Sequence, residues 1–163
     1  KIKNKSIETE IFGKTILNPI GIAAGFDKDA EVYNSLFKLG FGFVEVGTVT
    51  PINQYGNPKP RIFRLEEDEA LINRLGFNNS GSEKVSTRII SNPPKGLFGI
   101  NIGPNKDTKS RIEDFLICLN KFYNLADYLT INISSPNTEN LRSFHNEDEL
   151  DALLGAIEKE KKY

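Results

Sequence analysis

The alternation of short apolar runs with helical patterns constrains the fold of this chain more than any other feature. Four runs are apolar nearly throughout, as expected of strands buried on both faces: residues 19–24, 43–47, 97–102 and 128–133. Four further stretches are typical of helices: residues 30–39, 82–90, 111–119 and 147–161. This order of strands and helices predicts βαβ units, a parallel sheet and therefore an α/β fold.

The number of βα units leaves two architectures open. Four units are half of an eight-stranded (β/α)8 TIM barrel, which usually takes about 250 residues, but a flavodoxin-like sheet also fits four or five strands. Residues 7–17 alternate loosely around a Phe-Gly-Lys turn and predict a small hairpin ahead of the first strand. No linker or longer repeat interrupts the pattern, so we expect one domain over residues 1–163.

Charge and cysteine content exclude several kinds of function. The chain has 21 basic and 22 acidic side chains, so its charge does not indicate a nucleic-acid partner. Its single cysteine, Cys118, excludes an internal disulfide and a cysteine-rich zinc site, and its apolar helical surroundings predict a core position. No metal-ligand cluster or Walker loop is visible, and the only histidine, His145, is expected at the surface or as a helix cap.

The chain carries no sequence signal for membrane insertion or secretion. No apolar run approaches the roughly 20 residues of a membrane span, and the first residues lack a signal-peptide pattern. Because the sequence contains no methionine, we expect that Lys1 is not the native start.

The residues that follow each apolar run are the candidates for a site, because catalytic groups of a barrel collect where its strands end. After the first run, small residues would let a ligand lie against the backbone beside the cation of Lys28, although this stretch alone is more typical of a plain βα turn. Asn132 lies within an apolar run and must have a hydrogen-bond partner, from the protein or from a ligand. Ser135 follows it, but serine is a poor base in isolation, and composition alone favours a structural role.

Residues 51–79 are predicted to form a long polar loop, and loops of that length inside compact domains are usually functional. The loop is rich in asparagine and arginine, which suits an anionic ligand that also carries amides. The alternative is that these side chains brace the loop by bonding its own backbone.

Six sequence blocks, taken in order, resemble class 2 (quinone-linked) dihydroorotate dehydrogenases. They are Ala-Ala-Gly-Phe-Asp-Lys (23–28), Phe-Val-Glu-Val-Gly-Thr-Val-Thr-Pro (43–51), Gly-Asn-Pro-Lys-Pro-Arg-Ile-Phe-Arg (56–64), Ile-Asn-Arg-Leu-Gly-Phe-Asn-Asn (72–79), Gly-Ile-Asn-Ile-Gly (99–103) and Asn-Ile-Ser-Ser-Pro-Asn-Thr (132–138). The resemblance implies an FMN-binding TIM barrel. Residues 1–18 would form the hairpin at the barrel bottom, and residues 19–163 the first four βα units.

The resemblance also implies a role for each matching residue. Those that would contact FMN are Ala24, Gly25, Phe26, Asp27, Lys28, Thr48, Asn101 and Asn132. Those that would bind the substrate are Lys28, Asn73, Arg74, Leu75, Gly76, Phe77, Asn132, Ser135 and Asn137. Ser135 would be the catalytic base; class 1 relatives use a cysteine from a loop in this region, and this chain has none there.

The implied activity is flavin-dependent oxidation of (S)-dihydroorotate to orotate in pyrimidine biosynthesis, with a membrane quinone as electron acceptor. The family class implies a peripheral position on the inner membrane, at the bacterial cytoplasmic face or in mitochondria. The quinone would be met through a segment that this chain does not include. We expect the isolated segment to be inactive, since relatives continue with four more βα units.

Two departures from the family pattern and three alternatives remain. Asn140 stands where relatives commonly have glycine, and we expect it to adopt the same left-handed turn. Pro104 stands where a lysine is more usual, and no implied catalytic role depends on it. The alternatives are a dihydropyrimidine dehydrogenase domain, a non-catalytic interaction protein on a degenerate barrel, and a generic phosphate-binding barrel enzyme.

Overall fold

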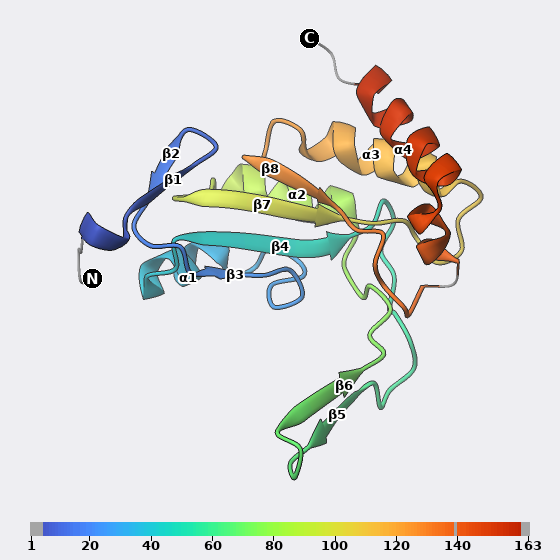
Figure 1. Cartoon of the computed structure of the whole chain (residues 1–163), viewed down its shortest axis with the longest axis horizontal. Helices are drawn as coiled ribbons and strands as arrows, with labels where there is room; N and C mark the ends of the chain where they lie inside the picture. The colour runs from blue at the N-terminus through green and yellow to red at the C-terminus, as the bar shows by residue number, and fades with distance from the viewer. Residues whose placement is uncertain (1–4, 139, 161–163) are drawn as a thin grey trace.

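The computed structural model describes residues 5–138 and 140–160 and shows an α/β fold built on a four-stranded parallel sheet (Figure 1). The sheet strands are β3 (Gly21–Ile22), β4 (Phe43–Val49), β7 (Leu97–Ile102) and β8 (Tyr128–Ile131). The helices are α1 (Tyr33–Leu39), α2 (Ser82–Ser91), α3 (Arg111–Phe122) and α4 (Glu147–Glu160), with 3-10 turns η1 (Lys5–Ile7) and η2 (Leu141–His145). Two antiparallel hairpins are also present: β1 (Thr9–Ile11) with β2 (Lys14–Ile16), and β5 (Ile62–Leu65) with β6 (Ala70–Asn73).

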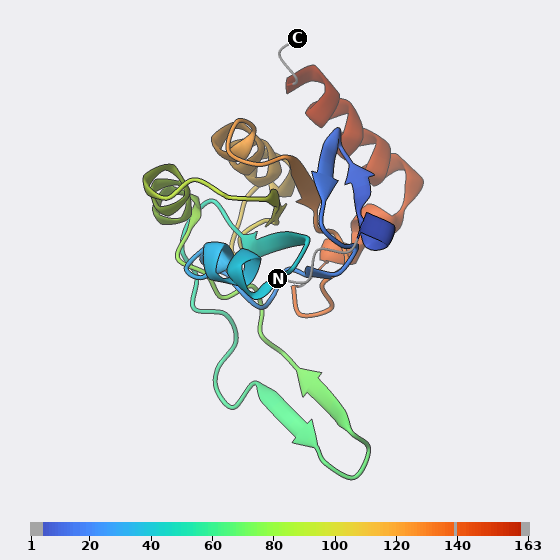
Figure 2. The same cartoon turned by 90° about the vertical axis from the view of Figure 1, so that its left-hand side faces the viewer.

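The strands lie in the sheet in the order in which they occur in the chain, β3-β4-β7-β8, and all neighbours are parallel. A flavodoxin-like sheet reverses its strand order at a switch point and carries helices on both faces. Here α1, α2 and α3 lie on one side of the sheet, which Figure 2 shows nearly end-on. The sequential order and the one-sided helices exclude the flavodoxin-like alternative that the sequence pattern left open.

The predicted strands and helices are confirmed, with shifts at their ends; residue 161, the last of the helix predicted at 147–161, lies outside the described residues. The strand predicted at residues 19–24 is only two residues long in β3. The first helix begins at Tyr33, later than predicted, because the Asp27 carboxylate accepts the backbone N–H groups of Glu31 and Val32 at 2.8 Å each and holds a turn there. Gly40 ends α1 in the left-handed conformation, with φ 114°, which glycine adopts without a side-chain clash.

The main core lies between the sheet and the helices. Val44 and Val46 of β4 and Phe115 and Phe122 of α3 are fully buried there. Burial of each such side chain stabilises the fold by about 1.5–3 kcal/mol. Because side chains alternate along a strand, the residue between the two valines, Glu45, faces the other side of the sheet. The helices therefore bury one face, and the opposite face is left for polar groups.

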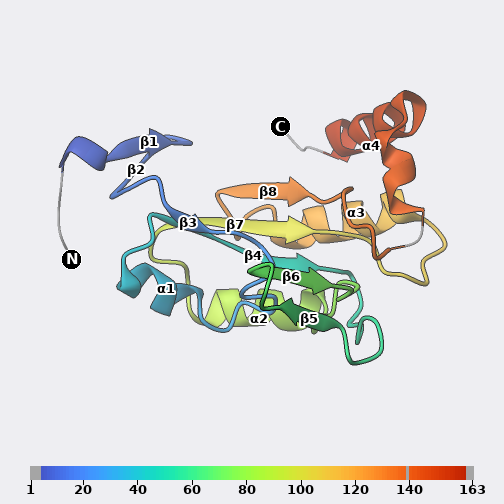
Figure 3. The ribbon, with the colours of Figure 1, turned by 60° about the horizontal axis from the view of Figure 1, so that its bottom comes forward.

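The two hairpins lie at opposite ends of the parallel strands, as Figure 1 and Figure 3 both show. The β1–β2 hairpin was predicted, and it meets the start of β8 through the rings of Phe12 and Tyr128, 5.4 Å apart, and the Lys14–Asp127 ion pair at 2.6 Å. The β5–β6 hairpin lies near the strand ends, where a loop without strands was expected. That expectation was wrong for residues 62–73, which pair in register from Ile62 with Asn73 onward.

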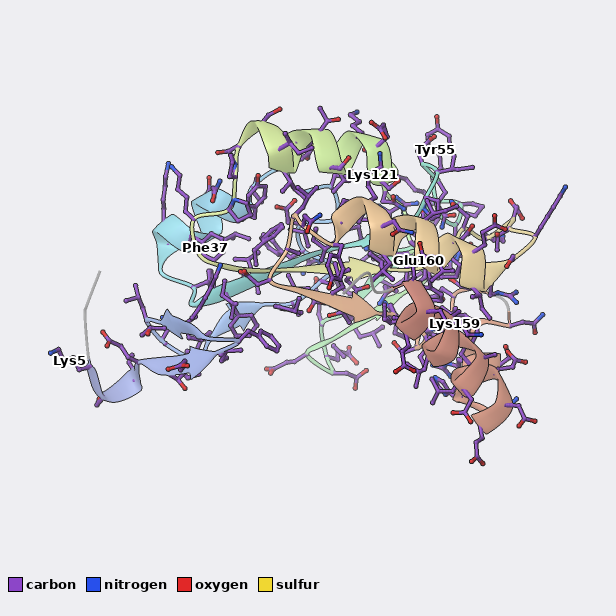
Figure 4. The ribbon with its side chains drawn as sticks, turned by 90° about the horizontal axis from the view of Figure 1, so that it is seen from above. Lys5, Phe37, Tyr55, Lys121, Lys159 and Glu160 are labelled. Atoms are coloured by element: carbon purple, nitrogen blue, oxygen red, sulfur yellow. The ribbon has the colours of Figure 1, made fainter. Side chains whose placement is uncertain are left out.

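Helix α4 packs against α3 and η2 through Leu153, which is fully buried. Leu154, the next residue of α4, is 50% exposed, so the helix does not bury both leucines. Near the end of α4 the Asn120 amide of α3 donates to the Glu160 carboxylate at 2.6 Å, where Figure 4 shows the two helices converging. Within the described residues, no helix combines the length and apolar composition needed to cross a membrane.

Candidate functional site

A cavity of about 450 Å³ lies where β4, β7 and β8 end and where the chain returns from the β5–β6 hairpin. Its walls come from segments that are far apart in the sequence but adjacent at one end of the sheet. The lining residues are Ala23, Ala24, Gly25, Lys28, Glu45, Thr48, Asn73, Leu75, Gly76, Phe77, Asn101, Asn132, Ser135, Pro136 and Asn137. The carboxyl ends of parallel strands are where α/β enzymes place their sites.

The structure brings all but three of the site residues expected from the sequence to this cavity. Phe26 is 68% exposed, and the Asp27 carboxylate is occupied with the turn before α1. The Arg74 guanidinium donates to the Pro60 carbonyl through Nε at 3.0 Å and Nη2 at 2.8 Å, and it lies 5.7 Å from the Phe63 ring centre. The Asp27 and Arg74 side chains therefore hold backbone segments in place beside the cavity, and none of the three residues lines it.

Both interpretations of the polar loop find support in the structure. Its later part, residues 73 and 75–77, reaches the cavity, while its earlier part bonds backbone groups within the loop. The Asn57 amide donates to the Arg74 carbonyl at 2.9 Å, and Arg61 donates to the carbonyls of Tyr55 and Asn57. The asparagines and arginines of this loop therefore divide between a wall of the cavity and the braces that support it.

A hydrogen-bonded cluster of three side chains forms the floor of the cavity. The Thr48 hydroxyl donates to Asn101 Oδ1 at 2.6 Å, and Asn132 Nδ2 donates to Thr48 Oγ1 and to Asn101 Oδ1 at 3.1 Å each. Asn132 Oδ1 in turn accepts from the backbone N–H and the hydroxyl of Ser134, both at 3.1 Å. The prediction that Asn132 must have a partner is confirmed, and the partners are protein groups: Thr48 of β4, Asn101 of β7 and the nearby Ser134.

Lys28 supplies the cation that lines the cavity. Burial, and then repulsion from the Arg61 guanidinium, lowers the pKa of Lys28 below its ordinary value of 10.5, while the Asp29 carboxylate opposes the shift. Removing an ammonium group from water makes its charge act more strongly on any anion that shares the cavity. The site therefore favours a ligand with negative charge near Lys28.

Ser135 lies at the mouth of the cavity in a tight turn after β8. Its hydroxyl oxygen accepts the backbone N–H of Asn137 at 3.3 Å, which fixes the direction of the side chain. Pro136 and Asn137 of the same turn also line the cavity. Ser135 thus has a defined position beside three candidate substrate-binding groups: Lys28, Asn73 and Asn137.

Three other expectations about single residues are confirmed. Cys118 is fully buried in the core, and burial, followed by the charge of Asp114, raises the pKa of its thiol to about 12. His145 is exposed, and its Nε2 lies 3.1 Å from the Ile133 carbonyl oxygen. Asn140 adopts the left-handed conformation expected in place of glycine, with φ 55°. Among the residues that the structure describes, no group of three acidic, histidine or cysteine side chains could hold a metal ion.

Three lining residues, Ala23, Glu45 and Pro136, are absent from the site residues expected from the sequence, and Glu45 is the charged one. Glu45 lies in the middle of β4 and reaches the cavity floor, where its carboxylate accepts from Asn101 and Thr130, at 2.9 Å each. The signal was a single acid inside an otherwise apolar strand. Such a residue must be paired when it is buried, just as was argued for Asn132.

Comparison with known proteins shows the family of the chain. The dihydroorotate dehydrogenase family model matches residues 6–162. The chain is 53% identical over 162 residues to the dihydroorotate dehydrogenase (quinone) of Bartonella tribocorum, covering 99% of this chain and 45% of the relative. It is 56% identical over 147 residues to the enzyme of the same name from Rhizobium etli, covering 90% of this chain and 41% of the relative.

Solved structures give the same result for the fold. The ligand-free dihydroorotate dehydrogenase of Eimeria tenella superposes with a TM-score of 0.91 at 43% identity, covering 99% of this chain and 48% of that chain. The complex of the Eimeria tenella enzyme with ferulenol superposes with a TM-score of 0.90 at 44% identity, covering 97% of this chain and 44% of that chain. The chain thus spans less than half the length of these relatives. Because the match extends over nearly all of its residues, the resemblance inferred from the six blocks is confirmed, and the chain belongs to the dihydroorotate dehydrogenase family, as a relative of its quinone-linked members.

Proposed function

We propose that the whole protein oxidises (S)-dihydroorotate to orotate in pyrimidine biosynthesis with the help of bound FMN and a quinone as electron acceptor. In this proposal the chain forms the first four βα units of an eight-stranded barrel, as one part of a single domain, and the protein is peripheral on the inner membrane. The observation that supports it most is the cavity itself, which gathers a cation, four asparagines and a serine at the strand ends.

The residues present fit a flavin. Ala23, Ala24 and Gly25 form a wall of small side chains, and a Cβ added at Gly25 would meet nothing within 4 Å, so a flat ring can lie against this backbone. The residues that would hold FMN are Ala24, Gly25, Lys28, Thr48, Asn101 and Asn132. Amide and ammonium groups are suitable partners for the carbonyl and nitrogen edge of a flavin.

The remaining wall suits dihydroorotate, a ring of amides that carries a carboxylate. Asn73 and Asn137 offer amides, and Lys28 offers a cation. Oxidation removes a proton from one ring carbon and a hydride from its neighbour. Bound FMN supplies the acceptor for that hydride. Ser135 would take the proton and, because a serine hydroxyl is a weak base near neutral pH, would pass it on to water.

The test uses a hybrid enzyme in which residues 6–162 of this chain replace the matching segment of the Bartonella tribocorum relative. We expect the hybrid to contain FMN and to reduce a soluble quinone with dihydroorotate. Ser135→Ala should keep its FMN and lose roughly 10²–10⁴-fold in kcat, the usual contribution of a general base. Ser91→Ala is the matched control, because that hydroxyl bonds only the Thr87 carbonyl on the exposed side of α2.

Two results would contradict the proposal in different ways. A hybrid that binds FMN but leaves dihydroorotate unchanged would refute the substrate. A Ser135→Ala variant with undiminished kcat would leave the substrate standing and remove the role of Ser135. For the chain alone, we propose that it is inactive and binds FMN weakly, which a flavin-fluorescence titration measures; one FMN per chain together with turnover would be the opposing result.

A further inference from the structure

We infer that Glu45 is a positioning residue, whose carboxylate sets the direction in which the side-chain amides of Asn101 and Asn132 point at the cavity floor. The inference rests on the proposed function in one respect only, namely that this cavity takes the flavin. Glu45 itself acts through other side chains. Its effect is to decide which hydrogen-bonding atoms the floor can offer to a ligand.

Strand register explains how Glu45 reaches this position. Glu45, Gly99 and Tyr128 are partners across β4, β7 and β8 and form one row on the face of the sheet away from the helices. A Cβ on Gly99 would lie 2.2 Å from the Tyr128 ring, so only glycine lets that ring cross β7 toward Glu45. The next row toward the strand ends pairs Asn101 with Thr130, and both side chains extend to Glu45.

The carboxylate is surrounded by donors. Asn101 Nδ2 donates to Oε1 at 2.9 Å, and the Thr130 hydroxyl donates to Oε2 at 2.9 Å. Burial, followed by the charge of Glu45 and by hydrogen bonding to it, raises the pKa of Tyr128, so its hydroxyl stays protonated and can donate to the carboxylate. Three strands therefore contribute to the same partly buried cluster: Glu45 from β4, Asn101 from β7, and Tyr128 and Thr130 from β8.

A carboxylate can only accept hydrogen bonds, and this property determines the direction of every later bond in the cluster. The Asn101 NH₂ group must face Glu45, because the reversed amide would set its oxygen against the carboxylate oxygen. Asn101 Oδ1 is then left to accept from Thr48 and Asn132, as observed at 2.6 and 3.1 Å. The Asn132 NH₂ group donates to that oxygen, so the Asn132 oxygen is left to accept from Ser134.

One hydrogen of the Asn101 NH₂ group remains after the bond to Glu45, next to the cavity that Asn101 lines. The floor therefore presents a donor, and it suits a ligand whose facing edge carries an acceptor, such as a ring carbonyl or ring nitrogen. Glutamine in place of Glu45 keeps the size of the side chain but can donate as well as accept. Both directions of the Asn101 amide then become possible.

The experiment compares Glu45→Gln, Thr130→Val and Glu10→Gln in the hybrid enzyme. Thr130→Val removes one bond to the same carboxylate without changing the direction of Asn101, and Glu10 is an exposed residue of β1. For each apoprotein, the dissociation constant of FMN is measured by fluorescence titration, and the melting temperature is measured without flavin. The kcat and KM for dihydroorotate are measured on the loaded enzyme.

We expect Glu45→Gln to weaken FMN binding about 10-fold, the effect of losing one well-placed hydrogen bond, with the apoprotein melting temperature close to that of the parent hybrid. Thr130→Val and Glu10→Gln should change the FMN dissociation constant less than twofold. Equal weakening by Glu45→Gln and Thr130→Val, in step with a lower melting temperature, would show that Glu45 is merely structural. Unchanged FMN binding in Glu45→Gln would also overturn the inference.

The two proposals fail separately. If the hybrid binds FMN but does not oxidise dihydroorotate, the proposed function fails while the FMN dissociation constants still test Glu45. If the hybrid takes up no FMN, NMR of protein labelled with ¹⁵N-asparagine decides the question. The Asn101 NH₂ signal, assigned by its loss in Asn101→Asp, should exchange slowly with water in the parent and faster in Glu45→Gln; equal exchange would refute the inference.

Discussion

Replacing Gly47 by alanine tests how closely β4 and β7 approach beneath the cavity. Gly47 has φ 105°, and an added Cβ would lie 2.4 Å from the Asn101 carbonyl oxygen and 3.0 Å from the Val49 nitrogen. These are backbone atoms, so neither can rotate aside. The two strands would have to separate next to the side chains of Thr48 and Asn101, which form the cavity floor.

The loss of stability expected for Gly47→Ala has two parts, backbone strain and steric crowding, and the same substitution at Gly25 measures the strain alone. A side chain at this φ costs about 1–3 kcal/mol in backbone strain, and forcing extra volume into a packed site costs about another 1–3 kcal/mol. Gly25 has nearly the same φ, 107°, but its added Cβ would meet nothing within 4 Å. Gly47→Ala should therefore lower the free energy of unfolding by about 2–6 kcal/mol, and Gly25→Ala by only the strain, about 1–3 kcal/mol.

Equilibrium urea denaturation of the two hybrid variants measures the difference between them. We expect Gly47→Ala to be the less stable by about 1–3 kcal/mol, with a matching loss of FMN affinity as Asn101 moves. If the two variants lose the same unfolding free energy, within about 0.5 kcal/mol, strain alone acts at both positions. In that case β4 and β7 do not approach as closely as the structure indicates.

Two further predictions follow from the pKa shifts. Because the pKa of Lys28 is lowered, its charge should be lost at a lower pH than that of an ordinary lysine, and KM for the anionic substrate should rise with pH through that pKa. Asp29→Asn removes the charge that opposes the shift, so the rise in the KM–pH profile of the hybrid should begin at lower pH; an unchanged or higher onset would contradict the assignment. Because the pKa of Cys118 is raised to about 12 and the thiol is fully buried, iodoacetamide at pH 8 should alkylate it only in denaturant, as mass spectrometry would show; rapid labelling of the folded protein would refute its core position.

Much of the fold could be predicted because it depends on local periodicity. Apolar runs and helical spacing located the four parallel strands and the helices, and Asn140 marked a left-handed turn that the structure contains. The β5–β6 hairpin could not be predicted in the same way. Its strands expose Ile62, Leu71 and Ile72, and they are held by pairing with each other, which no hydrophobic period reveals.

The residues around the cavity also divide into those that the sequence could predict and those that it could not. Asn101, Asn132 and Ser135 could be proposed from sequence because they lie at the ends of strands, and parallel strands bring their ends together; Asn73 lies in the polar loop, and its role came from the resemblance. Phe26, Asp27 and Arg74 lie in the same blocks, yet they do not line the cavity. Phe26 is exposed, and local bonds determine the direction of the other two side chains, as those of Arg74 to the Pro60 carbonyl do. Adjacency in a motif does not determine which way a side chain points.

By itself, the sequence determined the α/β class, the family and most of the residues around the cavity, since these depend on residue type and order along the chain. Tertiary structure alone decided the sequential strand order, the β5–β6 hairpin and the place of Glu45. Glu45 meets Thr130 across 85 residues because two strand registers put their rows next to each other. Register is a property of pairing between distant segments, and a shift of one residue would turn Glu45 into the helix-covered core.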